Sequence, residues 1–148
     1  MVFPWSSGFR PARVATATVS VGPPPVFEDV TTSTDGWIRG TVRSDRGAVE
    51  LLIALPVGQV TQARVESENV ALTDGAWTGG FSVVNLPGAD SIYLELKRAS
   101  GAPLEFWLAD TAYGIPERAA DPLRLREPHR LPTHSGDATM SLYQIRIP

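Results

Sequence analysis

The chain has 148 residues, of which 43% are hydrophobic and 20% charged, and its formal net charge at pH 7 is −3. This length and balance favour one globular domain with a single core over a disordered chain. The sequence has no cysteine, which excludes disulfides and cysteine nucleophiles, and its well-mixed charges disfavour nucleic acid as a partner.

No segment has the length and apolar character of a membrane span, which needs ~20 apolar residues. The first residues lack the early basic region and the continuous apolar core of a signal peptide. We therefore expect a soluble chain. The absence of cysteine is compatible with the cytosol and with the periplasm, so composition leaves the compartment open.

Apolar and polar residues alternate along nearly the whole chain, and this period of two indicates strands with one buried face. In chain order, the segments expected to form strands are 13–21, 26–32, 36–44, 48–55, 62–67, 77–84, 91–98, 102–110 and 139–147. The alternation predicts a core that contains Leu51, Ile53, Ile92, Leu94, Phe106 and Leu108.

Turn residues separate these strands. The Asp-Gly pairs at 35–36 and 74–75 reach positive φ at low cost. Ser100-Gly101 joins two alternating runs and predicts a hairpin over residues 91–109. Many short strands without a helical period predict an all-β fold, an antiparallel β-sandwich or a partly open barrel of about eight to ten strands.

The stretch from 115 to 138 contains four prolines and cannot be a central strand. Leu123, Leu125 and Leu131 alternate with arginines within it. A disordered linker does not ordinarily place leucines so regularly. We expect a long proline-rich surface strap that lies across the sandwich, with its leucines against the sandwich, and leads to the final strand.

Two histidines, His129 and His134, lie five residues apart and are followed by Asp137. Pro128 and Pro132 impose an extended backbone, so the histidines do not share one face of a helix as in metalloprotease motifs. Solvated loop histidines are the favoured interpretation, and no metal site is predicted.

Catalytic carboxylates would have to come from Glu28/Asp29, Glu66/Glu68 or Glu105/Asp110. Acids at such spacings are typical of a solvated sheet face. A serine nucleophile is not indicated either, because no serine lies in a Gly-x-Ser-x-Gly elbow. The chain is therefore expected to contain no catalytic residue and to need no cofactor of its own.

Trp37, Trp77 and Trp107 are the candidate binding residues. Trp37 and Trp107 fall on the nominally polar face of their strands, where one face would carry an aromatic platform for a sugar or peptide. The favoured alternative is that the tryptophans pack beneath the strap or against a neighbouring domain.

The segment LADTAYGIP, residues 108–116, has a structural interpretation. Asp110 is expected to end a strand, and Gly114 and Pro116 are expected to redirect the chain. Tyr113 is expected to pack its ring at the end of the sandwich with its hydroxyl on a backbone partner.

Three short motifs resemble a known family. They are Pro-x-Arg-hydrophobic at Pro11–Val14, Ser-x-Arg-Gly-Ala at Ser44–Ala48 and Asp-x-x-Tyr-Gly-Ile-Pro at Asp110–Pro116. Through these three motifs, the chain resembles the C-terminal, non-catalytic region of bacterial multi-pass membrane peptidases of the zinc aminopeptidase family. That family includes vacuolar membrane protease and endoplasmic reticulum metallopeptidase. The sequence departs from it at Asp137-Ala138-Thr139, where similar proteins tend to have Asp-Thr-Thr.

The resemblance implies that residues 1–148 are one β-sandwich domain from the C-terminal part of a larger membrane peptidase. It implies an extracytoplasmic, periplasmic-side accessory domain that packs on the catalytic domain of the same parent chain or contacts its peptide substrates. Zinc would belong to the parent peptidase domain, because this chain has no His-x-Asp motif or Glu-Glu pair, and the isolated chain would not be an enzyme. The alternative is a free-standing carbohydrate- or peptide-binding sandwich that uses Trp37, Trp77 or Trp107.

The strap prediction can be tested by replacing Leu125 with aspartate. If Leu125 is buried, the variant should lose about 2–4 kcal/mol of unfolding free energy, because a carboxylate would replace an apolar side chain in the core. Thermal denaturation measures this loss. A variant that melts within about 2 °C of the parent would show that the leucine is not buried.

Overall fold

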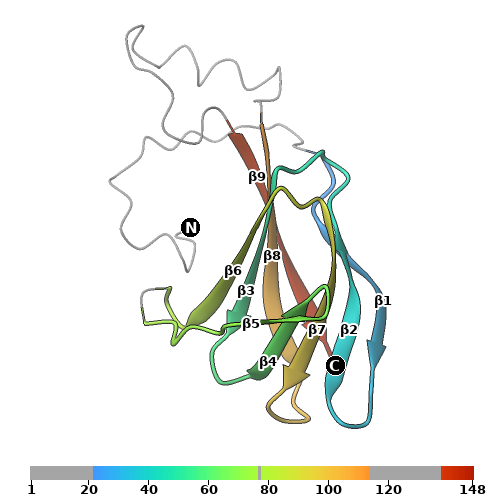
Figure 1. The fold of residues 1–148 in the computed structure, drawn as a ribbon, viewed down its shortest axis with the longest axis vertical. Coiled ribbons are helices and arrows are strands. Elements are labelled where there is room, and N and C mark those ends of the chain that lie inside the picture. The colour runs from blue at the N-terminus through green and yellow to red at the C-terminus, as the bar shows by residue number, and fades with distance from the viewer. Residues whose placement is uncertain (1–21, 77, 114–137) are drawn as a thin grey trace, which may run out of the picture.

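The computed structural model describes residues 22–76, 78–113 and 138–148, and within these ranges the chain is all-β (Figure 1). The described strands are β1 (Val26–Thr32), β2 (Trp37–Arg43), β3 (Glu50–Pro56), β4 (Val60–Val65), β5 (Glu68–Val70), β6 (Phe81–Pro87), β7 (Ser91–Arg98), β8 (Leu104–Tyr113) and β9 (Ala138–Ile147). The described residues contain no helix with the length and apolar character that crossing a bilayer requires.

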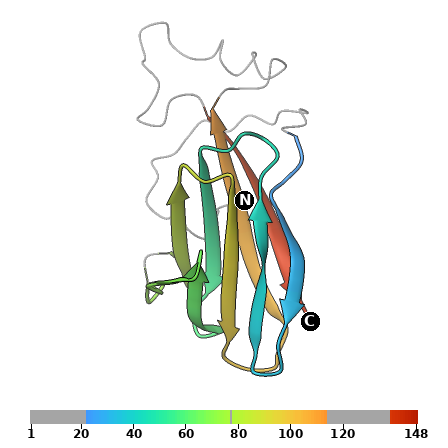
Figure 2. The ribbon, with the colours of Figure 1, turned by 45° about the vertical axis from the view of Figure 1, so that its right-hand side comes forward.

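The strands form two antiparallel sheets. Sheet A has the order β1-β2-β7-β4-β5, and sheet B has the order β6-β3-β8-β9. The sheets stack as the two layers of a sandwich and do not close into a barrel, which confirms the predicted all-β sandwich class (Figures 1 and 2). The expected strand at 13–21 and the strap at 115–138 lie outside the described residues, apart from the last position of the strap range.

The first Asp-Gly turn forms as predicted. Gly36 has φ of +86°, and the chain reverses there between β1 and β2. The Ser33 backbone N–H donates to the Trp37 carbonyl at 2.8 Å, and the Ser33 hydroxyl bonds the Asp35 carboxylate. A residue with a Cβ would strain this left-handed position, so the sequence specifies the turn locally.

The predicted hairpin over residues 91–109 is wrong. β7 belongs to sheet A and β8 to sheet B, and the loop between them crosses the sandwich at its lower end in Figure 2. Both strands bury their even-numbered residues, and these residues face each other across the core. Alternation therefore identifies the buried face of each strand without identifying the neighbour to which it hydrogen-bonds.

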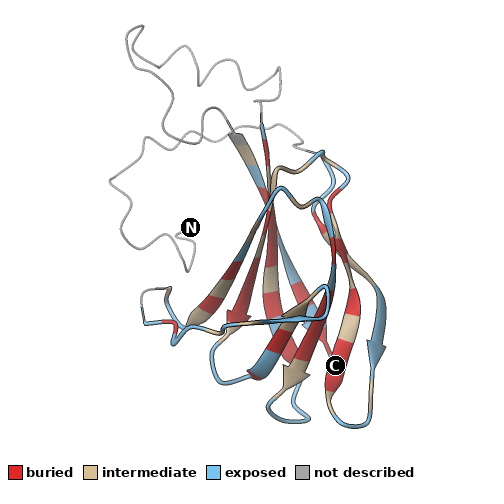
Figure 3. Cartoon of the chain, viewed as in Figure 1, coloured by how far each residue is buried: buried red, intermediate tan, exposed pale blue. Residues whose placement is uncertain are grey.

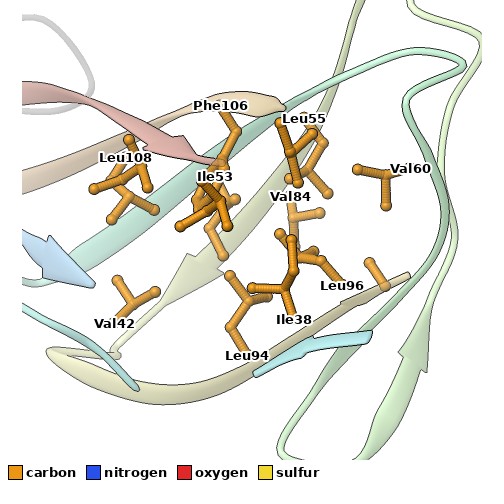
Figure 4. Close-up of a cluster of buried hydrophobic side chains, with 14 of the residues drawn as sticks. Ile38, Val42, Ile53, Leu55, Val60, Val84, Leu94, Leu96, Phe106 and Leu108 are labelled. Carbon is orange, nitrogen blue, oxygen red and sulfur yellow. The ribbon is translucent and has the colours of Figure 1, made fainter. Parts of the chain in front are cut away.

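The core lies between the two sheets, where buried residues alternate with more exposed ones along most strands (Figure 3). The six predicted core residues are all buried, so this prediction is confirmed. Figure 4 shows many of the side chains that meet there, among them Ile53, Leu94 and Phe106. The Phe106 ring packs edge-on against Phe27, with 5.6 Å between ring centroids. This pair joins β8 to the edge strand β1 across the core.

Gly40 of β2 makes room for that contact. A Cβ built at Gly40 would lie 2.7 Å from the Phe27 ring and 2.8 Å from the Glu28 carbonyl oxygen. Real Cβ atoms do not approach other atoms so closely, because repulsion rises steeply at such distances. The glycine therefore lets β1 and its phenylalanine lie close against β2.

Gly40→Ala should destabilise the protein by about 1–3 kcal/mol, because β1 and Phe27 must move away from β2. The matched control is Gly101→Ala, where a Cβ would meet nothing within 4 Å. The control should change the free energy of unfolding by less than about 1 kcal/mol. Equal stability of the two variants in urea denaturation would contradict the close approach at Gly40.

Candidate functional site

The outer face of sheet A is lined by paired charges. The Arg39 Nε atom lies 2.9 Å from Glu95 Oε1, and the Arg43 Nε atom lies 2.8 Å from Glu28 Oε1. The Lys97 Nζ atom lies 3.7 Å from a carboxylate oxygen of Asp35. Opposite charges pair across neighbouring strands here, although Glu95 itself is only 7% exposed.

Two carboxylates at this face titrate below their ordinary range. The hydrogen bond from Arg43 lowers the pKa of Glu28, and the hydrogen bond from the Ser33 hydroxyl lowers the pKa of Asp35. A lowered folded-state pKa contributes stability above the unfolded pKa, and this contribution disappears as the pH falls through the folded value. Both carboxylates are ionised at neutral pH and are poor general acids.

Trp37 lies on this outer face beneath three cations. The guanidinium carbon of Arg64 is 4.6 Å from the Trp37 ring centroid, that of Arg39 is 5.7 Å from it and the Lys97 Nζ atom is 5.6 Å from it. Only 8% of Trp37 is exposed. Cation–π contacts occupy the ring, so Trp37 does not present an open stacking surface.

The shared aromatic platform expected for Trp37 and Trp107 is wrong. Trp37 is in β2 of sheet A and faces away from the core, since Ile38 beside it is fully buried. Trp107 is in β8 of sheet B, between the buried core residues Phe106 and Leu108. The two rings therefore lie on opposite outer faces of the sandwich. Trp77, the third candidate, lies outside the described residues.

The outer face of sheet B is apolar over four strands. Ala54 of β3 lies directly opposite both Val83 and Trp107, and Ala109 of β8 lies directly opposite both Leu52 and Leu142. Residues paired in this way have Cβ atoms about 5 Å apart, so their side chains touch. We call this surface the apolar face of sheet B; it comprises Leu52, Ala54, Phe81, Val83, Trp107, Ala109, Met140 and Leu142.

Charged and polar side chains surround the apolar face. Glu50 of β3 and Asn85 of β6 lie beside it, and Gln144 of β9 lies directly opposite Trp107 of β8. Glu105 and Arg146 form an exposed ion pair at the lower end, with 3.4 Å between the Arg146 Nε atom and a Glu105 oxygen. An apolar centre with a polar rim is the composition of protein–protein interfaces.

The sequence of β3 contains a signal for this face. The run ELLIALP of β3 is apolar without alternation. Such a run is typical of a strand that is covered on both faces. By contrast, the expectation that Trp107 falls on the outward face of its strand was correct, because Trp107 and the exposed Glu105 are both odd-numbered residues of β8.

Asp110 is fully buried on the inner face of β8. Its carboxylate accepts a hydrogen bond from Arg46 Nη1 at 2.8 Å and another from the Ser44 hydroxyl. The Arg46 side chain is only 7% exposed, and its Nη2 atom donates to the Thr139 carbonyl of β9 at 3.3 Å. A buried carboxylate paired in this way is a structural anchor without access to substrate.

Backbone hydrogen bonds join the same loop, residues 44–49, to both sheets. The Ser44 N–H donates to the Asp90 carbonyl next to β7, and the Val49 N–H donates to the Thr111 carbonyl of β8, each at 2.8 Å. The Gly88 N–H donates to the Val49 carbonyl at 2.7 Å. Together with the buried ion pair, these bonds fix the path of the chain from sheet A to sheet B.

Two expectations for residues 108–116 need correction. β8 does not end at Asp110, because its pairing with β9 continues to Tyr113 and Ala138. Tyr113 is 71% exposed and does not pack its ring at the end of the sandwich. Its position in β8 puts it on the outer face together with Trp107. Gly114 and Pro116 lie outside the described residues.

The candidate acid pair Glu105 and Asp110 does not converge. Glu105 and Asp110 lie on opposite faces of β8, the former exposed and the latter buried. Glu66 accepts a hydrogen bond from the Tyr93 backbone N–H at 2.6 Å. Within the described ranges, no group of three or more His, Asp or Glu side chains is placed to hold a metal ion. His129, His134 and Asp137 lie outside those ranges.

No protein-family model matches the chain, and no curated protein matches it.

The structural role of Asp110 predicts strong coupling with Arg46. Asp110→Leu alone should lower the free energy of unfolding by about 3–5 kcal/mol, because it leaves the guanidinium buried without its carboxylate. Arg46→Met should cost a similar amount. The double variant should recover at least about 2 kcal/mol of the summed loss, because an apolar pair replaces the ion pair.

Glu105 and Arg146 provide the matched control, since this pair is exposed. The corresponding cycle of Glu105→Leu and Arg146→Met should show less than about 1 kcal/mol of coupling. Urea denaturation of all six variants gives both coupling energies. Additive effects at Asp110 and Arg46 would mean that the pair does not anchor the fold.

Proposed function

We propose that this chain is a non-catalytic accessory domain of a membrane-bound zinc peptidase, and that it packs on the peptidase catalytic domain of the same parent chain. The proposed location is extracytoplasmic, on the periplasmic side. The observation that carries the docking role is the apolar face of sheet B.

The composition of this face supports a docking role. Eight residues, spaced about 4.8 Å across the strands and about 7 Å along them, give a footprint of roughly 270 Å². This is just below the ~300–600 Å² of the largest apolar patch on a typical monomer. Met140 of this face is 43% exposed, whereas Ala54 and Ala109 at its centre are 3% and 1% exposed. Together with its polar rim, the face suits the centre of an interface of about 800 Å² per partner.

The contrast between the two outer faces supports the same conclusion. Sheet A has on its outer face the ion pairs Arg39–Glu95 and Arg43–Glu28. The middle of the outer face of sheet B has instead Leu52, Ala54 and Ala109. This difference in composition favours sheet B over sheet A as the docking face.

The link to a peptidase comes from the resemblance at Ser44–Ala48 and Asp110–Pro116. Ser44 and Arg46 of the first motif meet Asp110 of the second motif at the buried ion pair. These residues join the loop between the sheets to β8, and this structural use agrees with a non-catalytic role. Zinc and the hydrolytic chemistry are assigned to the parent peptidase domain.

The second candidate is a free-standing carbohydrate- or peptide-binding sandwich. Trp107 favours it, because its half-buried ring lies within the apolar face. Trp37 disfavours it, because Arg39, Arg64 and Lys97 already contact its ring. Genomic context separates the two candidates. The accessory role requires an upstream reading frame, joined in frame to this chain, that encodes membrane helices and zinc ligands.

Leu52→Lys should weaken association with the peptidase domain from that reading frame by at least about tenfold, because it places a charge in the centre of the interface. The matched control is Thr41→Lys, at a half-buried outward position of sheet A. The control should leave association unchanged, and both variants should fold. Titration calorimetry measures the affinities.

Equal binding by Leu52→Lys and the parent would contradict docking through the apolar face. A separate test addresses catalysis. The purified chain should not hydrolyse aminoacyl or peptide substrates, and hydrolysis that a chelator abolishes would refute the non-catalytic role.

A further inference from the structure

β9 is the last strand of sheet B among the described strands. It pairs with β8 residue by residue over its whole length, without a bulge. From Ser141 to Ile147, no described strand pairs with its other edge. A long, regular edge of this kind is a template for another strand.

The other sheet edges formed by described strands are shorter or interrupted. The pairing of β1 with β2 is irregular between Glu28 and Thr31, and Asp29 there has φ of +54°. β5 has three residues, and β6 ends at Pro87. Bulges, prolines and short strands limit edge pairing, whereas β9 has no proline or glycine and has a single charged residue, Arg146.

The backbone groups of β9 that face this edge follow from the pairing of β8. The Thr111 carbonyl of β8 accepts from the N–H of Val49, immediately before β3, at 2.8 Å. Successive residues of a strand point their backbone groups to opposite sides, so the even-numbered residues of β8 point theirs toward β9. These residues lie directly opposite odd-numbered residues of β9. The N–H and C=O groups of Leu142, Gln144 and Arg146 therefore point away from β8, toward the edge.

A groove of about 430 Å³ runs between β9 and β1, which lie on the same side of the sandwich (Figure 2). Phe27 of β1 and Tyr143, Ile145 and Ile147 of β9 contribute apolar walls. Tyr143 lies directly opposite the core residue Leu108, which places it on the inner face of β9. It is nevertheless 46% exposed, so a partner at this edge would bury apolar surface that the described residues leave open.

The edge residues of β9 are self-complementary when two copies pair antiparallel. The register that aligns all of Ser141–Ile147 with the same segment of a second copy puts Gln144 opposite Gln144. Tyr143 then lies opposite Ile145 on the inner face, and Leu142 lies opposite Arg146 on the outer face. Each residue keeps its own face of the sheet, so the apolar inner positions of the two copies meet.

The charges also fit a second copy. The single charged residue of β9 is Arg146, and in this register its two copies lie four residues apart along the strand, about 13 Å. Like charges directly opposite each other, which destabilise a sheet, are thus avoided. The two Gln144 side chains meet on the symmetry axis, where each amide group can both donate and accept.

We propose that two copies of this chain associate through their β9 edges, about a two-fold axis at Gln144, and join their B sheets into one continuous antiparallel sheet. A two-fold dimer is the commonest assembly of identical chains. This inference is independent of the proposed function, because it uses the edge of sheet B and not its outer face.

The size of the contact predicts a weak dimer. Seven strand residues span ~23 Å, and two stacked sheets with their side chains are roughly 20 Å thick. The contact therefore covers up to roughly 450 Å² per copy, below the ~800 Å² of a standard stable interface. The dimer should be the main species at ~1 mM protein and largely dissociated at ~10 µM.

Amide hydrogen exchange of the parent chain tests the pairing. At ~1 mM, the amides of Leu142, Gln144 and Arg146 should exchange at least about threefold more slowly than at ~10 µM, because hydrogen bonds to the second copy protect them. The amides of Tyr143 and Ile145 are internal controls. They point toward β8 and should be equally protected at both concentrations.

Two results of this measurement would overturn the proposal. Edge amides that are already protected at the lower concentration would show that the chain covers its own edge. Edge amides that exchange equally fast at both concentrations would show that a second copy does not bind there.

The chain has no cysteine, so single introduced cysteines test the register without background. Gln144→Cys puts two sulfurs on directly opposite residues, whose Cα atoms lie about 5.5 Å apart in a hydrogen-bonded pair. Leu142→Cys and Arg146→Cys are the matched controls, because each cysteine lies about 13 Å from its own copy. Under mild oxidation, Gln144→Cys should form interchain disulfides at least about tenfold faster than either control.

A mixture of the two control variants completes this test. Leu142→Cys and Arg146→Cys chains, mixed in equal amounts, should crosslink to each other faster than to themselves, because the register puts these two positions opposite one another. Mass spectrometry distinguishes the mixed dimer from the two homodimers. Equal rates for the three single variants, without preference for the mixed dimer, would contradict the pairing.

Discussion

The buried ion pair between Arg46 and Asp110 is the interaction on which the rest of the structure depends. A charged carboxylate inside a sandwich costs several kcal/mol in lost hydration unless partners replace the water. Here Ser44 and Arg46 both donate to Asp110, and Arg46 also reaches the Thr139 carbonyl. The partners come from the loop between the two sheets, from β8 and from β9. The pair therefore joins the crossing loop to the centre and edge of sheet B at one end of the molecule.

The outer faces of the two sheets differ in composition. The outer face of sheet A has carboxylates and cations that neutralise one another, and even its tryptophan, Trp37, lies beneath cations. The outer face of sheet B has an apolar centre around Ala54 and Ala109 with a polar rim. An internal anchor, one charged outer face and one apolar outer face are the observations on which the proposed docking role rests.

Much of the fold was predictable from sequence because period-two alternation and Asp-Gly turns are local properties. Alternation identified the inner faces of β3, β7 and β8, and Gly36 formed its turn as predicted. The strand to which each strand hydrogen-bonds was harder to predict from sequence. β7 and β8 were predicted to pair because a short loop joins them, but the same loop length also crosses between sheets. The Arg46–Asp110 pair could not be predicted for a similar reason. The two residues are 64 positions apart in the sequence, and neither has a local signature of its partner.

The central claim is that the Arg46–Asp110 pair is buried and rigid in solution. Nitrogen-15 NMR of the arginine side chains tests it most directly, with Arg146 as an internal control because its side chain is 72% exposed. Arg46 should show separate, slowly exchanging Nη resonances at neutral pH, because hydrogen bonds to Asp110 and Thr139 hinder rotation of the guanidinium and exclude water. Arg146 should show averaged, rapidly exchanging signals. Averaged signals for Arg46 that match those of Arg146 would contradict the account.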